Sequence, residues 1–286
     1  MFKEDTLSSK TVLVTGGGSG LGLAMSKSFA ALGAQVLICG RRMEKLEAAA
    51  KEIDEAAASG KATGFYSVDV RDYDAVGAMM DEIAESYGGC DVLVNNAAGN
   101  FLSASEDLSP NAFRAVVDIV LNGTFNCTQQ FGKRLIDAKK EGSILNIVTT
   151  YTETGSAFVL PSACAKAGVY AMTNTLAYEW ATYGIRVNSI APGPFPTEGA
   201  WTRLMPDPKM EKAYLKQIPA GRYGKHEELA NLACFLISDL AGYITGECVT
   251  IDGGERLKSG QFNFITQAAP RDQLKQFFGM MKPSKN

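Results

Sequence analysis

The sequence has little of what metal sites and disulfide frameworks require. It contains six cysteines and one histidine among 286 residues. No two cysteines form a CxxC pair, and a single histidine cannot complete a Cys/His zinc set. The lone His226 stands where a helix would begin and is interpreted as a structural surface residue. We therefore predict no metal site and reduced cysteines, which are typical of a reducing compartment.

Long apolar runs, targeting signals and an excess of positive charge are also missing. No apolar run approaches the ~20 residues of a membrane span. The N-terminal segment MFKEDTLSSK lacks both the apolar core of a secretory signal and the arginines of a transit peptide, and the chain ends without a peroxisomal tripeptide. The 28 Lys and Arg residues against 31 Asp and Glu give a net charge of −3, which disfavours a nucleic-acid partner. These absences favour a cytoplasmic protein with no membrane span; a mitochondrial matrix location would require that a presequence had been removed.

The sequence does have the composition of an ordinary globular domain, with 46% hydrophobic and 21% charged residues. Seven short, mostly apolar segments alternate with longer helical patterns. These expected strands begin at Thr11, Val36, Phe65, Asp91, Ser143, Ile185 and Glu247. The alternation predicts an α/β fold: a single-domain, doubly wound, Rossmann-type parallel sheet of about seven strands with helices on both faces.

No repeat or linker divides the chain, so residues 1–286 are interpreted as one domain. The proline-rich segment 195–218 interrupts the alternation and is predicted to be a substrate lid over the strand ends. Residues from 255 onward form a predicted C-terminal extension. Within it, residues 273–281 have helical spacing, which we interpret as packing or a subunit contact.

A glycine-rich turn joins the first expected strand to the first expected helix and runs from Gly16 to Gly22. Early glycines permit a tight turn, a later one lets a pyrophosphate approach, and the helix N-terminus offers free N–H groups to phosphates. The pattern predicts a dinucleotide site. Its candidate residues are Gly16, Ser19, Gly20, Leu21 and Gly22.

The end of the second expected strand bears on which dinucleotide binds. Sites that prefer NAD usually carry an Asp or Glu there, whereas this sequence has Arg41 and Arg42. Two guanidinium groups suit a 2′-phosphate through charge-assisted bonds. The pair therefore predicts NADPH/NADP+ as cofactor; the alternative is that both arginines simply begin an exposed helix.

Further motifs follow the third, fourth and sixth expected strands: Asp69-Val70, the run from Asn95 to Gly99, and Pro192-Gly193-Pro194. With the glycine turn they resemble the short-chain dehydrogenase/reductase family, over about Lys10 to Gly254. The resemblance implies further cofactor contacts. These are Asp69, Val70, Asn96, Ala97, Lys166, Pro192, Gly193 and Phe195.

The sequence departs from that family at the usual catalytic motif. Members carry Tyr-x-x-x-Lys after the fifth strand, whereas this chain has Ser162 four residues before Lys166. An aliphatic hydroxyl is too weak an acid to protonate an alkoxide as a tuned phenol does. Thr149 stands near the usual serine position, and Val120 stands where many relatives have an asparagine. The usual carbonyl-reducing relay is therefore not expected.

Two other polar residues lie at strand ends: Tyr151 after the fifth strand and Asn100 after the fourth. The chain resembles the 2,4-dienoyl-CoA reductases of the family in four motifs, which are residues 95–101, residues 118–124, the Tyr-x-Glu-Thr-Gly run from Tyr151, and residues 161–168 with Ser162 and Lys166. The resemblance implies NADPH-dependent reduction of 2,4-dienoyl-CoA to 3-enoyl-CoA in the breakdown of unsaturated fatty acids. Tyr151 and Asn100 would bond the thioester oxygen, Lys166 would hold the nicotinamide ribose, and Ser162 would bond the cofactor or Lys166.

The resemblance also implies an acyl-CoA thioester partner and a homotetramer built on Ala112 to Ile136 and Ala163 to Tyr183. The implied substrate contacts are Arg71, Phe101, Ser109 and Arg203. Two alternatives remain open. One is an NADPH-dependent 3-oxoacyl or other carbonyl reductase that uses Tyr151 as a displaced acid. The other is a non-catalytic NADP(H)-binding regulatory protein.

Overall fold

A computed structural model describes residues 2–197, 201–205 and 207–281. Seven strands pair in parallel in the order β3-β2-β1-β4-β5-β6-β7. They are β1 (Thr11–Thr15), β2 (Gln35–Gly40), β3 (Gly64–Ser67), β4 (Val92–Asn95), β5 (Gly142–Ile147), β6 (Ile185–Pro192) and β7 (Cys248–Ile251). The strand order reverses between β1 and β4, which is where such sheets bind ligands. The predicted doubly wound sheet is confirmed.

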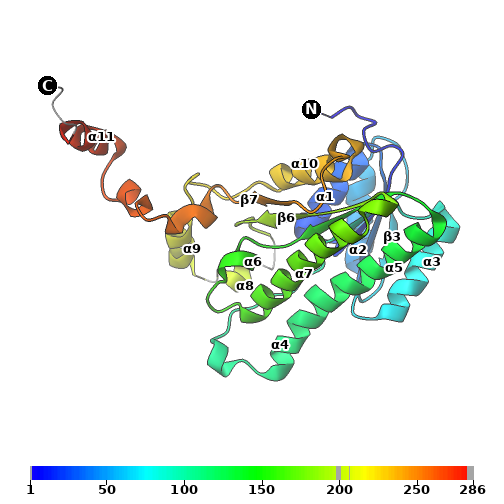
Figure 1. The fold of residues 1–286 in the computed structure, drawn as a ribbon. Coiled ribbons are helices and arrows are strands. Elements are labelled where there is room, and N and C mark those ends of the chain that lie inside the picture. Colours follow the sequence, from blue (N-terminus) through cyan, green and yellow to red (C-terminus); the bar gives the residue numbers. More distant parts are fainter. Residues whose placement is uncertain (1, 198–200, 206, 282–286) are drawn as a thin grey trace.

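Helices cover both faces of the sheet (Figure 1). One face carries α1 (Gly20–Ala31), α2 (Met43–Ala56) and α10 (His226–Ile237); the other carries α3 (Tyr73–Tyr87), α5 (Gly123–Ala138) and α7 (Leu160–Glu179). The core follows the pleat of the strands. Val12 and Val14 of β1 face one apolar cluster, whereas Leu13 faces the other. Strands buried on both faces therefore have nearly continuous apolar sequences.

One long helix on the second face contains a wide turn. It consists of α4 (Pro110–Val117), the π-helical turn η2 (Asp118–Asn122) and α5. The Thr124 hydroxyl donates a 2.7 Å hydrogen bond to the carbonyl of Val120, which lies in this turn. Val120 itself is 0% exposed within an apolar cluster. The turn is therefore stabilised by a side-chain hydrogen bond and by core packing.

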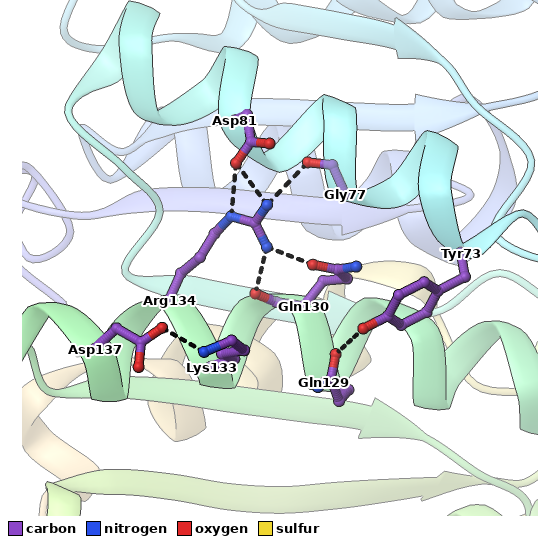
Figure 2. Close-up of polar contacts among 8 residues, drawn as sticks. All are labelled: Tyr73, Gly77, Asp81, Gln129, Gln130, Lys133, Arg134 and Asp137. Carbon is purple, nitrogen blue, oxygen red and sulfur yellow. Dashed lines mark hydrogen bonds and ion pairs between the residues drawn. The ribbon is translucent and has the colours of Figure 1, made fainter.

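Polar side chains fasten α5 to α3 (Figure 2). Arg134 reaches from α5 to the Asp81 carboxylate at 2.5 Å and to the Gly77 carbonyl at 3.1 Å. Further along, the Tyr73 hydroxyl donates to the Gln129 side chain at 2.6 Å. These contacts hold α5 close to the loop that follows β3.

That loop begins directly after Ser67, where β3 ends. Asp69 and Val70 therefore lie past the strand end, as expected. The chain turns because Asn126 of α5 donates to the carbonyls of Val70 and Arg71 at 3.0 and 3.2 Å. The backbone there is bonded to a helix and not to a neighbouring strand.

The expected lid and C-terminal extension contain short helices. These are α8 (Trp201–Leu204), α9 (Pro208–Leu215), η5 (Glu255–Ser259), η6 (Asn263–Gln267) and α11 (Arg271–Met280). Beyond β7 the chain passes α9 and then leads away from the sheet to α11 (Figure 1). The remaining short elements are η1 (Ser105–Asp107), α6 (Tyr151–Thr154), η3 (Ala181–Tyr183) and η4 (Asp239–Ala241). In the described part of the chain, no helix has the length and apolar character that crossing a membrane requires.

Candidate active site

The glycine turn between β1 and α1 has backbone conformations and close contacts that require glycine. Gly16 and Gly20 have φ of 66° and 54°, a region that favours glycine. A Cβ on Gly22 would lie 2.5 Å from the Gly16 carbonyl oxygen. Ser19, the N-cap of α1, makes no side-chain capping bond within the described chain, so the first N–H groups of α1 remain available. These available N–H groups at a helix N-terminus fit the pyrophosphate of a dinucleotide.

The end of β4 holds the glycine turn in place. The Asn96 side-chain amide donates to the carbonyls of Thr15 and Gly16, at 3.0 and 3.3 Å. The Thr15 hydroxyl in turn accepts bonds from the backbone N–H groups of Asn96 and Ala97, both at 3.0 Å. Asn96 and Ala97, which we predicted to contact the cofactor, are thus joined directly to the turn.

Charged residues gather past the ends of β2 and β3. Arg71 forms an ion pair with Asp69 at 2.6 Å, and this bond lowers the pKa of the Asp69 carboxyl. The nearby Arg41 charge lowers that pKa further, so Arg41 and Asp69 lie within electrostatic range. Arg42 is the N-cap of α2, and both Arg41 and Arg42 are exposed. These residues share one edge of the sheet, where the ribose end of a dinucleotide would lie.

Three polar side chains from separate segments meet past β4 and β5. The Tyr151 hydroxyl, at the start of α6, lies 3.0 Å from the Ser162 hydroxyl of α7. The Asn100 side-chain amide donates to the Tyr151 hydroxyl at 3.4 Å. Ser162 is 3% exposed. Ser162 therefore lies against Tyr151, whereas the family resemblance implied a bond from Ser162 to the cofactor or to Lys166.

Lys166 lies one helical turn beyond Ser162 and is 6% exposed. Its ammonium group donates to the Ile147 carbonyl at the end of β5. Burial lowers the pKa of Lys166 to about 8. Thr149 follows Ile147 by two residues, and its hydroxyl is buried and has no hydrogen-bond partner among the described residues. A bound polar ligand would satisfy such groups.

The loop after β6 reaches back to the glycine turn. Phe195 is buried, and the Gly193 N–H donates to the Ile251 carbonyl at 2.9 Å. The methyl of Thr197 lies 3.2 Å from the position that a Cβ on Gly20 would take. Thr197 was not predicted as a site residue. The sequence could have indicated it by a hydroxyl residue five positions after Pro192, in the same loop.

His226 contributes to this loop in a way that the sequence did not indicate. Its ring nitrogen Nε2 lies 2.7 Å from the carbonyl of Pro196, next to Thr197. His226 begins α10, as expected, but it is half-buried and not merely exposed. It therefore fixes the loop against α10.

The expected substrate residues are only partly brought together. Phe101 packs on the apolar cluster around Val120, and its N–H donates to the Asn100 side chain at 2.9 Å. Ser109 instead caps α4, accepting the Ala112 N–H at 3.2 Å. Arg71 is paired with Asp69. The side chain of Arg203 lies outside the part of the chain that the structure describes.

Aromatic side chains join the expected lid to the C-terminal segment. The Trp201 ring meets the Tyr223 ring edge-on at a centroid distance of 4.9 Å. The Tyr214 hydroxyl donates at 2.9 Å to the buried carboxylate of Glu255. Burial raises the pKa of Tyr214, with Glu255 and Tyr151 adding to the effect. Tyr214 of α9 thus lies within electrostatic range of Tyr151.

The parallel sheet, the glycine turn and the contact of Tyr151 with Ser162, one helical turn from Lys166, define a Rossmann-type oxidoreductase. A family model described as enoyl-(acyl carrier protein) reductase matches residues 16–255. The chain is 46% identical over 254 residues to a probable 2,4-dienoyl-CoA reductase of Bacillus subtilis, of the (2E)-enoyl-CoA-producing type, covering 88% of this chain and 99% of that protein. It is 44% identical over 259 residues to a probable 2,4-dienoyl-CoA reductase of Caenorhabditis elegans, of the (3E)-enoyl-CoA-producing type, covering 90% of this chain and 83% of that one.

A solved structure gives the same result. The crystal structure of a short chain dehydrogenase from Bacillus anthracis is 45% identical, with a TM-score of 0.80, and the match covers 88% of this chain and 99% of that chain. The chain belongs to the short-chain dehydrogenase/reductase family. The family predicted from the sequence is confirmed.

Proposed function

We propose that the chain reduces 2,4-dienoyl-CoA to 3-enoyl-CoA with NADPH, in the breakdown of unsaturated fatty acids. The observation that carries the proposal is the contact of Tyr151 with Asn100 and Ser162, one helical turn from buried Lys166. A phenol after β5 replaces the family's usual phenol four residues before the lysine. The 2,4-dienoyl-CoA reductase names of the two relatives support the same activity.

The residues present fit an NADPH molecule. The glycine turn would hold the pyrophosphate, Arg41 and Arg42 the 2′-phosphate, and Lys166 the nicotinamide ribose. Asp69 and Val70 would line the adenine site, and Pro192 to Phe195 would flank the nicotinamide. When bound, the reduced nicotinamide supplies a hydride to the far end of the conjugated diene.

Tyr151 and Asn100 would stabilise the negative charge that collects on the thioester oxygen. A hydroxyl has one proton to donate and can accept two hydrogen bonds. Tyr151 can therefore accept from Asn100 or Ser162 and still donate its proton to the substrate oxygen. The Asn100 amide would supply the other donor. Fixed donors aimed at a developing oxyanion are usually the largest single contribution to catalysis.

Lys166 and Ser162 would support this pair. A pKa of about 8 leaves the Lys166 ammonium largely protonated at neutral pH, and its charge would favour an enolate nearby. Ser162 would orient the Tyr151 hydroxyl through their 3.0 Å contact. Water or Tyr151 would deliver the proton to the substrate carbon.

The proposal extends to assembly and organisation. A homotetramer built on the α4-η2-α5 helix and on α7 would cover Phe125 and Tyr178, which are 50% and 90% exposed on these helices. We also propose a single domain in which residues 195–218 form the lid and residues from 255 form an extension. A cytoplasmic location stays a prediction.

The activity is tested by following the loss of reduced nicotinamide absorbance with 2,4-hexadienoyl-CoA, with acetoacetyl-CoA and without substrate. We expect turnover with the dienoyl thioester, and identification of the product distinguishes the 3-enoyl from the 2-enoyl isomer. Tyr151→Phe should lower kcat by ~10²–10³, because one oxyanion donor is lost. Tyr243→Phe, which removes a fully exposed phenol away from the helices of the proposed tetramer, should not change it.

Three outcomes would contradict the proposed activity or its mechanism. Turnover only with acetoacetyl-CoA would make the chain a carbonyl reductase. Tight NADPH binding without turnover of either thioester would make it a non-catalytic binding protein. Full dienoyl-CoA turnover by Tyr151→Phe would remove Tyr151 from the mechanism.

Coenzyme preference is tested separately with Arg41→Ala and Arg42→Ala. Each should raise the KM for NADPH and leave that for NADH nearly unchanged, because only NADPH carries the 2′-phosphate. A wild-type protein that binds NADH as tightly as NADPH would contradict this assignment.

A further inference from the structure

Three lysines lie along one face of α9, at positions i, i+3 and i+7. Lys209, Lys212 and Lys216 are all exposed, and with Ala213, Gln217 and Gln267 they line a groove of about 430 Å³. Gln267 belongs to η6, so one wall of the groove is the C-terminal segment. In Figure 1 this segment lies next to α9. We call this feature the lysine groove.

The groove concentrates positive charge on a chain whose net charge is −3. Within the described residues, none of the three ammonium groups forms an ion pair with a carboxylate. Lys258 donates to the Gln217 side chain at 3.2 Å, but its charge is paired with Glu255 at 3.8 Å. The three charges are therefore available to an anion with several negative groups.

The opposite face of α9 packs against the lid and the C-terminal segment. Glu211 accepts a 3.1 Å bond from the Trp201 ring N–H, and Tyr214 bonds Glu255. In Figure 1, α9 lies next to α6, the helix that begins at Tyr151, and the influence of Tyr151 on the pKa of Tyr214 agrees with this. One helix thus has a face near the site of the thioester and another face in the lysine groove.

We propose that the lysine groove binds the phosphates of the coenzyme A half of the substrate. This inference rests on the proposed function. Coenzyme A carries a diphosphate and a 3′-phosphate, and the pantetheine arm separates them from the thioester. The groove is therefore suited to the phosphates while Tyr151 and Asn100 bond the thioester oxygen.

Two observations favour coenzyme A over the dinucleotide as the source of these phosphates. The glycine turn and the two arginines past β2 already provide for the phosphates of NADPH, on other elements of the fold. Arg71, which the resemblance assigned to the acyl-CoA, has its charge engaged by Asp69. Arg71 is therefore a weaker candidate for the coenzyme A phosphates than the groove lysines, which form no ion pair with a carboxylate among the described residues.

The kinetic test compares 2,4-hexadienoyl-CoA with 2,4-hexadienoyl-pantetheine, which has the same acyl chain and no nucleotide. The test variant changes all three groove lysines to glutamine. The matched control makes the same change in charge at three exposed lysines elsewhere, with K3Q, K51Q and K139Q. A second variant changes the groove lysines to arginine and keeps the charge.

We expect the glutamine variant to raise the KM for the CoA thioester ~10-fold, since each of three exposed charge contacts contributes modestly. The effect should shrink as salt is added. The KM for the pantetheine thioester, the KM for NADPH and kcat should stay nearly unchanged. The arginine variant and the control triple variant should behave as wild type.

A binding measurement separates this inference from the proposed function. Calorimetric titration of the NADP+-loaded protein should give tighter binding of coenzyme A than of 3′-dephospho-CoA, and the glutamine variant should lose that difference. Binding of coenzyme A that depends on the lysines, without any dienoyl-CoA turnover, would support the groove assignment and contradict the proposed activity. If the glutamine variant keeps normal turnover, KM and coenzyme A binding, the assignment of the groove to coenzyme A is wrong. It is also wrong if the KM of that variant rises for NADPH alone.

Discussion

The charge of buried Lys166 destabilises the folded chain, so replacing this lysine with an apolar residue should raise the free energy of unfolding. Burial lowers the pKa of Lys166 from its ordinary 10.5 to about 8. Each pKa unit corresponds to ~1.4 kcal/mol of preference for the neutral form. At pH 7 the protonated lysine therefore destabilises the cofactor-free folded chain by up to about 3 kcal/mol.

The pH dependence follows from proton binding in the two states. Below pH 8 the lysine is protonated in both the folded and the unfolded chain, so the full penalty applies. Between about 8 and 10.5 the unfolded chain binds the proton and the folded chain does not, so stability rises with pH. Above 10.5 both states are neutral and the penalty is gone.

Lys166→Met keeps an unbranched side chain and removes the ammonium group. We expect its free energy of unfolding, measured with urea in the absence of cofactor, to exceed that of wild type by up to about 3 kcal/mol at pH 7. The excess should fall as the pH rises toward 10. Lys139→Met, at an exposed lysine, should show no comparable gain.

The same variant should lose dienoyl-CoA turnover, since activity and stability conflict at this residue. The reasoning is refuted if Lys166→Met is no more stable than wild type at pH 7. It is refuted equally if the difference between the two proteins is the same at pH 7 and pH 10, because burial of a titrating charge requires it to change.

Two further substitutions test the cofactor turn and the tie between lid and tail. Gly22→Ala should weaken NADPH binding at least ~10-fold in a fluorescence titration, since its Cβ would lie 2.5 Å from a backbone oxygen of the turn. Gly279→Ala, at a glycine with open space around it, is the control. Equal NADPH affinities of the two variants would show that the turn does not bind the cofactor. Tyr214→Phe should lower the free energy of unfolding by ~1–3 kcal/mol, since it deprives the buried Glu255 carboxylate of a donor. A urea unfolding curve that overlays wild type would mean that α9 is not tied to the C-terminal segment by this bond.

The sheet and the glycine turn could be predicted because their signals are local. Each strand is a short apolar run, and adjacent side chains such as Val12 and Leu13 enter different cores, so the whole run must be apolar. The positive φ of Gly16 and Gly20 and the 2.5 Å approach of a Cβ on Gly22 to the Gly16 carbonyl oxygen are local requirements. Strand ends are harder to predict, because at β3 a side chain of α5 bonds the backbone that has left the sheet.

Most contacts within the candidate site could not be predicted, because they join segments far apart in the chain. The approach of Thr197 to Gly20 depends on how the loop after β6 folds back over the glycine turn. The bond from Tyr214 to Glu255 spans 41 residues. Arg71 and Asp69 are close in sequence, but their ion pair could not be predicted, because the sequence alone does not show which of the chain's many carboxylates an arginine contacts.

The contact between Tyr151 and Ser162 explains why the family's usual tyrosine is absent here. Ser162 stands four residues before Lys166, where other members carry the phenol, and its hydroxyl lies 3.0 Å from the Tyr151 hydroxyl. A ring on the Cβ of residue 162 would need the space that the Tyr151 hydroxyl now fills. The serine and the displaced tyrosine are therefore one change: the small residue makes room for the phenol and gives it a hydrogen-bond partner. In the proposed mechanism, Lys166 would serve a donor that approaches from the end of β5 and not from α7, and this donor would polarise the thioester oxygen instead of protonating an alkoxide.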